Sequence, residues 1–253
     1  MDPHIVRLWY AYPDDLLDAS LAESCLSLLS RDEVERRQFL RFDKDRRAFL
    51  ASRVNLRCAL SQCAPVAPRD WRFRVNEYGK PEIEKPEIEP DCGLRFNVSH
   101  SLHLVACVVS GEARVGVDVE SVERADEIAS IASDVFSAAE LAQFEPLRGS
   151  ARSERALSLW TLTEAYVKAR GLGLSLPLKA FSFLFDGAED IRLVPDPSWN
   201  DETRHFRFCL LHHAGHRIAL VIEGMAQPEI QIWRARPLLG SPVRVASGGE
   251  RWF

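Results

Sequence analysis

The chain has 253 residues, of which 46% are hydrophobic and 27% are charged. This composition is typical of soluble globular proteins and excludes collagen, coiled-coil and disordered chains. The formal net charge is −5, from 32 Lys and Arg against 37 Asp and Glu, which argues against a protein that coats nucleic acid or an anionic membrane. Any anion site must therefore be local.

Location and redox state follow from what the sequence lacks. The longest wholly apolar run, residues 104–109, is far shorter than the ~20 residues that cross a bilayer, and the N-terminus does not have the pattern of a secretory signal. The six cysteines form no C-x-x-C pair, so we expect reduced thiols rather than a zinc site or disulfides. These features predict a cytoplasmic protein.

In the first half of the chain, residues 5–10 have the apolar pattern of a strand. Apolar residues at three- and four-residue steps from Ser30 to about Cys63 predict one or two helices. Residues 71–75 alternate as a strand does and lead into turn residues 78–81. Two further strands, 94–98 and 102–109, are predicted on either side of a polar turn, residues 99–101.

The second half repeats this mixture of helices and strands. The pattern predicts helices at 138–144 and 154–170, and strands at 115–120, 181–185, 206–212 and 218–223. We therefore predict an α+β fold of two similar α/β halves, residues 1–111 and 112–236, followed by a flexible tail at 237–253. No residue-level repeat proves a duplication.

Two carboxylates are the first candidates for chemistry. Asp118 and Glu120 are two residues apart, so on a strand they share one face, with Val117 and Val119 on the other. Like charges ~7 Å apart repel unless a cation or protons lie between them, which suggests a hard divalent cation bound through oxygen. A strand running out into solvent is the alternative.

The predicted helix 154–170 adds an acid and a base. Trp160, Glu164 and Lys168 follow one another at steps of four, beside a separate apolar stripe. An exposed Glu-to-Lys pair is the simpler interpretation, but the large indole on the same line indicates that this face is partly covered. Gly171 after the helix is typical of a left-handed C-terminal cap.

Several residues are suited to binding an anion. Asn97, Ser99 and His100 form a small polar group that could hydrogen-bond one, and no G-x-S-x-G elbow makes Ser99 a nucleophile. Residues 31–57 contain nine Lys and Arg against five acids, which is either a solvated face or a dock for a multiply phosphorylated ligand. Lys80, in a tight loop, would add one more positive charge.

Four motifs in this order resemble the Sfp-type 4′-phosphopantetheinyl transferases. They are Tyr78-Gly79-Lys80-Pro81, residues 96–101 (FNVSHS), residues 116–120 (GVDVE), and residues 160–168 continuing into 171–178 (GLGLSLPL). The resemblance spans about residues 30–185. It implies two similar α/β halves related by a pseudo-twofold axis, with coenzyme A in the cleft between them.

The resemblance also implies roles for individual residues. Asp118, Glu120 and Glu164 match positions that hold Mg²⁺ against the coenzyme A pyrophosphate. Positions that contact phosphates are matched by Lys80, Ser99, His100 and Lys168, with Asn97 beside them. Arg36 is similar to the family's basic residue for the nucleotide phosphates, while Arg47 and Arg53 depend on the alignment register. Glu164 is the expected base, directly or through water, and Lys168 the expected neutraliser of phosphate charge.

The implied reaction moves phosphopantetheine from coenzyme A to a serine of an apo acyl or peptidyl carrier protein and releases 3′,5′-ADP. A chain with both halves is expected to act as a monomer, and the sequence does not specify the carrier or its pathway. Family members usually carry Lys where this chain has Thr163. We therefore keep a catalytically impaired coenzyme A or carrier-binding module as an alternative, and a different Mg²⁺-dependent phosphotransferase as a second. Thr163→Lys is expected to be tolerated.

Overall fold

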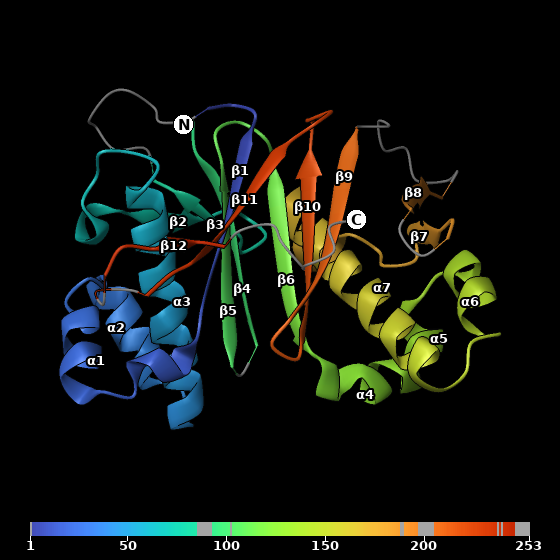
Figure 1. Cartoon of the computed structure of the whole chain (residues 1–253), viewed down its shortest axis with the longest axis horizontal. Helices are drawn as coiled ribbons and strands as arrows, with labels where there is room; N and C mark the ends of the chain where they lie inside the picture. The colour runs from blue at the N-terminus through green and yellow to red at the C-terminus, as the bar shows by residue number, and fades with distance from the viewer. Residues whose placement is uncertain are drawn as a thin grey trace.

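The computed structural model describes residues 2–84, 93–101, 103–187, 190–196, 205–236, 238 and 240–245. Two β-sheets pack against each other, and a long helix covers the outer face of each (Figure 1). The molecule therefore has four layers, in the order helix, sheet, sheet, helix. This arrangement confirms the predicted α+β class.

The N-terminal sheet has the strand order β12-β11-β1-β5-β4. Its central strand, β1, pairs antiparallel with β5 and parallel with β11. Helix α3 covers the sheet, and a small β2–β3 hairpin lies beside β4. The elements of this part are β1 (Ile5–Ala11), α1 (Ala19–Leu26), α2 (Arg31–Gln38), α3 (Asp43–Ser61), β2 (Phe73–Val75), β3 (Pro81–Ile83), β4 (Arg95–Ser101), β5 (Leu104–Ser110), β11 (Glu229–Arg234) and β12 (Val243–Arg244).

The C-terminal sheet has the order β6-β10-β9, with all neighbours antiparallel. Helix α7 crosses its outer face, and three short helices and a β7–β8 hairpin enclose the far side of α7 (Figure 1). The elements are β6 (Val115–Ser121), α4 (Ala125–Ser130), α5 (Ala132–Val135), α6 (Ala138–Phe144), α7 (Gly149–Arg170), β7 (Phe181–Phe185), β8 (Ile191–Pro195), β9 (Phe206–His213) and β10 (His216–Glu223).

The two halves share one topology. Each begins with a strand, continues through a long helix, and ends with an antiparallel hairpin whose second strand pairs with the first strand of that half. In the N-terminal half these elements are β1, α3, β4 and β5, and in the C-terminal half they are β6, α7, β9 and β10. The duplication that no residue-level repeat revealed is therefore visible in the strand order.

The last strands of the chain differ from the expected division. Residues 229–234 fall in the range assigned to the C-terminal half, yet they form β11, which pairs with β1 of the N-terminal sheet. Residues 243–244 of the predicted tail form β12 beside β11. Residues 229–234 join this sheet because β11 pairs with the edge of β1, whose backbone N–H and C=O groups on that side would otherwise have no partner.

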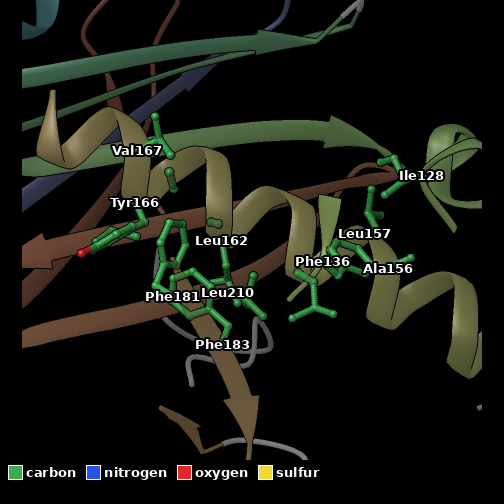
Figure 2. Close-up of a cluster of buried hydrophobic side chains, with 14 of the residues drawn as sticks. Ile128, Phe136, Ala156, Leu157, Leu162, Tyr166, Val167, Phe181, Phe183 and Leu210 are labelled. Atoms are coloured by element: carbon green, nitrogen blue, oxygen red, sulfur yellow. The ribbon is translucent and has the colours of Figure 1, made fainter. Parts of the chain in front are cut away.

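Three hydrophobic clusters hold the layers together. One lies between α7 and the C-terminal sheet, where Phe136, Leu162, Tyr166 and Phe183 are among its buried side chains (Figure 2). A second lies between α3 and the N-terminal sheet, and a third lies between the two sheets. Strand β5 is buried along its whole length because it contributes to the second and third clusters.

Most predicted elements are confirmed within a few residues, and two need correction. The predicted polar turn at 99–101 is wrong, because β4 runs through Ser101 and its inward polar groups bond to the neighbouring strand. Helix α7 begins at Gly149 rather than near residue 154. It ends as expected, since Gly171 is left-handed at φ 70° and its N–H donates to the carbonyl of Val167.

Candidate active site

The site is built where α7 lies directly on β6, and a glycine makes that approach possible. A Cβ atom at Gly116 would lie 2.0 Å from the carbonyl oxygen of Ala165 and 2.6 Å from the backbone nitrogen of Ala169. Only a residue without a side chain fits at that distance. The close contact places Trp160, Glu164 and Lys168 over the polar face of β6, while Val117 and Val119 enter the core between the sheets.

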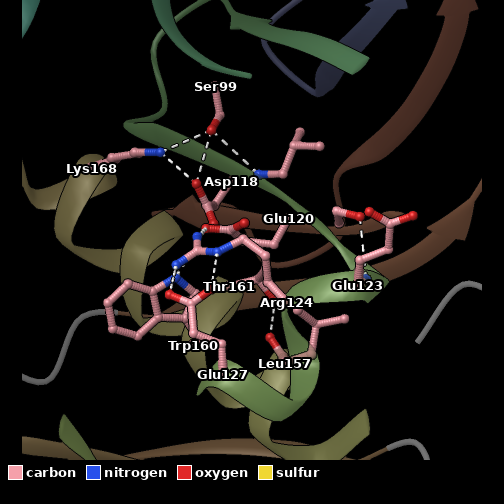
Figure 3. A network of polar contacts seen from close by, with 12 residues as sticks. Ser99, Asp118, Glu120, Glu123, Arg124, Glu127, Leu157, Trp160, Thr161 and Lys168 are labelled. Atoms are coloured by element: carbon pink, nitrogen blue, oxygen red, sulfur yellow. Dashed lines mark hydrogen bonds and ion pairs between the residues drawn. The ribbon is translucent and has the colours of Figure 1, made fainter. Parts of the chain in front are cut away.

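Asp118 is the most enclosed polar group of the site. Its Oδ1 accepts hydrogen bonds from Lys168 Nζ at 2.6 Å and from Ser99 Oγ at 2.8 Å (Figure 3). Asp118 is 5% exposed, and its buried Oδ2 has no hydrogen-bond partner among the described residues. A buried carboxylate oxygen without a donor is costly, so this atom is suited to a cation.

Glu120 lies next to Asp118 on the same face of β6 (Figure 3). Its Oε1 accepts from Arg124 Nη1 at 2.6 Å and from Trp160 Nε1 at 3.2 Å. Burial raises the pKa of Glu120, the negative charge of Asp118 raises it further, and the bonds from Arg124 and Trp160 oppose the rise. The indole that sequence analysis placed over this face thus contacts the carboxylate directly.

Glu164 lies on α7 between Trp160, which contacts Glu120, and Lys168, which contacts Asp118. Burial raises the pKa of Glu164, Lys168 lowers it, and Asp118 and Glu120 raise it again. These influences show that Glu164 is within electrostatic reach of both acids on β6. Lys168, one turn further along α7, pairs with Asp118 instead of forming a surface pair with Glu164.

A row of cationic groups continues from Lys168 toward α3. The ring of His100 is exposed on β4, yet removal of water by the surrounding protein lowers its pKa, and the charges of Lys168 and Arg53 lower it further. Burial lowers the pKa of Arg53, and Arg36 on α2 contributes to that shift. The charge of Glu33, whose Oε1 lies 4.0 Å from Arg53 Nε, opposes that shift, so Arg53 is influenced by an acid as well as by the neighbouring basic groups.

The other basic candidates have different surroundings. Arg47 is half-buried, and its Nε has no hydrogen-bond partner in the described part of the chain. Arg57 is 1% exposed and is held by Glu33 at 2.6 Å, so it stabilises the α2–α3 packing. Asn97 is buried, and its Oδ1 accepts from the backbone nitrogen of Val117.

Asn97 and Ser99 have a structural role in addition to any contact with a ligand. Ser99 Oγ accepts from the backbone nitrogen of Val119 at 3.3 Å, as Asn97 Oδ1 does from that of Val117 at 2.9 Å. These side chains replace ladder hydrogen bonds between β4 and β6 and connect the two halves. Because Ser99 also binds Asp118, the junction between the halves and the acidic site share one side chain.

Lys80 caps the end of α7. Its ammonium donates to the carbonyl oxygens of Lys168 at 2.6 Å and Ala169 at 3.3 Å, which are the terminal acceptors that a helix leaves unpaired. Burial lowers the pKa of Lys80 to about 8, and the positive charges of Arg114 and Arg95 also lower it. Lys80 is thus occupied by the helix end while facing other cations.

Those cations surround a cavity between the two halves, at the C-terminal end of α7. Its volume is about 390 Å³, and Glu82 is the only acid among the residues that line it in the described chain. The basic residues in its lining are Arg74, Lys80, Arg95, Arg114 and Arg170. Such an excess of positive charge suits an anion with several negative groups.

The three acidic residues of the site are candidate ligands for a cation. Within the described residues, no group of three or more His, Cys, Asp and Glu side chains is already arranged to hold a metal ion. The unpartnered Oδ2 of Asp118 nevertheless favours a cation here, as does the raised pKa of Glu120 and Glu164, which burial causes and the neighbouring carboxylates increase. An oxygen-only donor set of this kind fits Mg²⁺, which keeps most of its positions for water and substrate.

Thr163 does not occupy the surface of the site. It is 5% exposed within α7, next to Glu164 but about 100° around the helix. The missing family lysine is therefore replaced by a buried hydroxyl. This burial contradicts our expectation that Thr163→Lys is tolerated, because an ammonium there needs a path to water.

Comparison with known proteins identifies the family. The model of the 4′-phosphopantetheinyl transferase superfamily matches residues 114–221, and that of the 4′-phosphopantetheinyl transferase N-terminal region matches residues 17–112. HetI, a 4′-phosphopantetheinyl transferase of Nostoc sp. (strain PCC 7120), is 30% identical over 195 residues, 77% of this chain and 80% of that protein. This chain belongs to the 4′-phosphopantetheinyl transferase superfamily.

A second relative agrees with this assignment. The 4′-phosphopantetheinyl transferase Sfp of Bacillus subtilis (strain 168) is 30% identical over 193 residues, 76% of this phosphopantetheinyl transferase and 82% of Sfp. Among solved structures, the holo-[acyl-carrier-protein] synthase (AcpS) of Thermotoga maritima aligns with a TM-score of 0.36 and 26% sequence identity. The alignment covers 45% of this chain and 64% of the Thermotoga chain. Among the helices of the described residues, none combines the length and apolar composition that a bilayer crossing requires.

Proposed function

We propose that this phosphopantetheinyl transferase moves 4′-phosphopantetheine from coenzyme A to a serine hydroxyl of an apo acyl or peptidyl carrier protein and releases 3′,5′-ADP. The observation that carries the proposal is the junction of Asp118, Ser99 and Lys168, where one element of each half and α7 meet at a buried carboxylate. Because the two halves of the site are in one chain, we propose that the enzyme acts as a monomer.

Asp118, Glu120 and Glu164 would hold Mg²⁺, with Asp118 offering the oxygen that has no donor. Bound there, the ion supplies charge neutralisation for a pyrophosphate and a fixed orientation for it. It would also relieve the repulsion among the carboxylates, which adds to the effect of burial in raising the pKa values of Glu120 and Glu164. The three carboxylates can therefore bind a negatively charged phosphate only through a cation that lies between them and the phosphate.

The basic groups support a co-substrate with several phosphates. Lys168 lies at the acidic cluster, so it would neutralise charge on the pyrophosphate as the bond to the departing 3′,5′-ADP breaks. His100 on β4, Arg53 on α3 and Arg36 on α2 would contact the nucleotide phosphates. Lys80 lines the cavity at the end of α7. It would attract the phosphates together with Arg95 and Arg114, through their combined positive charge.

Glu164 is the proposed base. A serine hydroxyl is a weak nucleophile and needs a group that takes its proton as the oxygen attacks phosphorus. The raised pKa of Glu164 brings its basicity closer to neutral pH than that of an exposed glutamate. The proton moves from the serine to Glu164, directly or through water, while the phosphorus–oxygen bond to the nucleotide breaks.

The test is Glu164→Gln, assayed by the mass gain of an apo carrier protein in the presence of coenzyme A and Mg²⁺. We expect transfer to fall by at least about 10²-fold, since general base catalysis contributes about 10²–10⁴-fold. Glu154→Gln is the matched control, because Glu154 is exposed on the same helix. Normal turnover by Glu164→Gln would refute the assigned base.

Thr163 keeps one alternative open, a module that binds coenzyme A or a carrier protein without efficient transfer. Isothermal titration of the wild-type chain with coenzyme A, with and without Mg²⁺, separates the possibilities. Binding with transfer supports the proposal, and binding without transfer to any carrier of a panel supports the impaired module. Lack of coenzyme A binding would favour a phosphotransferase that acts on another nucleotide.

A further inference from the structure

The two carboxylates of β6 are held in the same way. Asp118 receives both of its hydrogen bonds, from Ser99 and Lys168, on Oδ1. Glu120 likewise receives both of its hydrogen bonds, from Arg124 and Trp160, on Oε1. Within the described residues, no hydrogen bond reaches the second oxygen of either carboxylate. Each acid therefore has one oxygen fixed by the protein and one left for another partner.

Arg124 is itself held in place on the opposite side. Its Nε and Nη2 donate to the two oxygens of Glu127 at 3.1 and 3.0 Å, while Nη1 reaches Glu120 at 2.6 Å (Figure 3). A planar guanidinium bound at both ends has a fixed orientation, which a lysine ammonium would not have. Arg124 follows directly from the turn after β6, so the same short segment carries the carboxylate and its holder.

We propose that Arg124, anchored by Glu127 and assisted by Trp160, is a positioning residue that holds Glu120 Oε1 so that Oε2 is presented to the divalent cation of the reaction. The inference rests on the proposed function, because it assigns Arg124 to the site that would hold Mg²⁺. Mutating a residue that orients a metal ligand through a hydrogen bond typically lowers metal affinity by about 10–100-fold. Arg124 does not touch the substrates in this assignment.

A different role for the same contacts predicts the opposite result. If Arg124 merely fills the position of the cation, its removal frees Glu120 and metal binding becomes tighter. If it positions Glu120, its removal lets the carboxylate turn away and binding weakens. The position of both donors on Oε1, with none on Oε2, favours positioning.

The experiment measures Mn²⁺ binding from the loss of the electron paramagnetic resonance signal of the free ion. Each sample contains saturating coenzyme A and no carrier protein. A blank with coenzyme A but no enzyme corrects for Mn²⁺ bound by coenzyme A alone. Arg124→Gln should weaken Mn²⁺ binding about 10-fold or more, and Glu127→Gln should weaken it less. Arg31→Gln is the matched control, because Arg31 forms an exposed ion pair with Glu35, four residues away, as Glu120 is from Arg124. Circular dichroism and thermal unfolding show whether each variant is folded.

The Asp118→Asn variant distinguishes a failure of the positioning role of Arg124 from a failure of the metal site itself. If it abolishes Mn²⁺ binding while Arg124→Gln binds as tightly as the wild type or tighter, the positioning role is overturned and the metal site stands. If the wild type itself binds no Mn²⁺ under these conditions, both the metal site and the role of Arg124 are overturned. A folded Arg124→Gln protein with weakened binding, together with an unchanged Arg31→Gln protein, supports the inference.

Discussion

Substituting Gly116 by alanine should separate the parts of the active site. The added Cβ would lie 2.0 Å from the carbonyl oxygen of Ala165, whereas ordinary contacts begin at 3.4 Å, so α7 and β6 must move apart by roughly 1.4 Å. The obstructing atoms belong to the helix backbone, so no change of side-chain rotamer relieves the contact. Glu164 and Lys168 move with α7, while Asp118 and Glu120 remain on β6.

The expected cost follows from this displacement. Overpacking a core costs about 1–3 kcal/mol, and rigid backbone on both sides places Gly116→Ala at the upper end. For a chain of this size, about 3 kcal/mol lowers the melting temperature by roughly 6–12 °C. Misplacement of catalytic groups by about 1 Å can cost about 10²-fold in rate, so transfer should fall far more than stability alone explains.

Gly215→Ala is the control for Gly116→Ala. Gly215 lies in the β9–β10 turn at φ 73° with open space around its Cβ position, so alanine there adds backbone strain of about 1–2 kcal/mol without moving α7. Both variants are assayed by thermal unfolding, by coenzyme A titration with Mg²⁺, and by mass gain of a carrier protein. If Gly116→Ala keeps the affinity and transfer rate of Gly215→Ala, the position of α7 does not control the site.

Three further predictions concern buried groups. Thr163→Lys should lower stability by about 1–3 kcal/mol in denaturant unfolding, and Thr163→Ser by less; equal stability of the two would contradict the burial argument. The pKa of Lys80 is about 8 in the folded protein, compared with an ordinary value of 10.5. Between these pH values the unfolded chain binds more protons than the folded one, so the free energy of unfolding should rise with pH. We expect a rise of up to about 1 kcal/mol per pH unit for the wild type relative to Lys80→Met. Parallel pH curves would show that the α7 carbonyls keep Lys80 charged. Burial lowers the pKa of His216, so wild-type stability should fall relative to His216→Asn as pH drops below 6.5, and exposed His212→Asn should keep the wild-type curve.

The sequence alone predicted the residue types at the site better than their contacts. Period-two spacing correctly placed Asp118 and Glu120 on one face of a strand, and helical spacing placed Trp160, Glu164 and Lys168 on one line. The pairing of Lys168 with Asp118 was not predictable, because it depends on the close packing of α7 against β6. Local rules offered Glu164 as the nearer partner.

Arg124 and Lys80 show what sequence reasoning missed. Arg124 lies four residues after Glu120, but that spacing indicates contact only within a helix, and Glu120 belongs to a strand. The tight loop and the family resemblance predict a phosphate contact for Lys80, but they do not predict that its ammonium donates to the carbonyl oxygen of Lys168, 88 residues away. Such partners become visible only when the two halves are folded together.

The same limit applied to the fold. Strong local patterns predicted β1, β6, α6 and β7 with nearly correct bounds, and they predicted the end of α7 but not its start. The alternating residues 229–234 were overlooked, and even a strand assignment there would not have indicated parallel pairing with β1 at the other end of the chain. Polar residues 97 and 99 suggested a turn because the backbone N–H groups of β6 that donate to their side chains cannot be identified from the sequence.

The parallel pairing of β11 with β1 makes the N-terminal sheet dependent on residues that a ribosome adds only after strands β1 to β10. Until about residue 234 has been synthesised, β1 has an open edge that other chains could join. A truncation before residue 229 would leave that edge open permanently, even though it spares every residue that we assign to the chemistry. Expression of the catalytic elements without the final strands should therefore yield aggregation rather than a smaller enzyme.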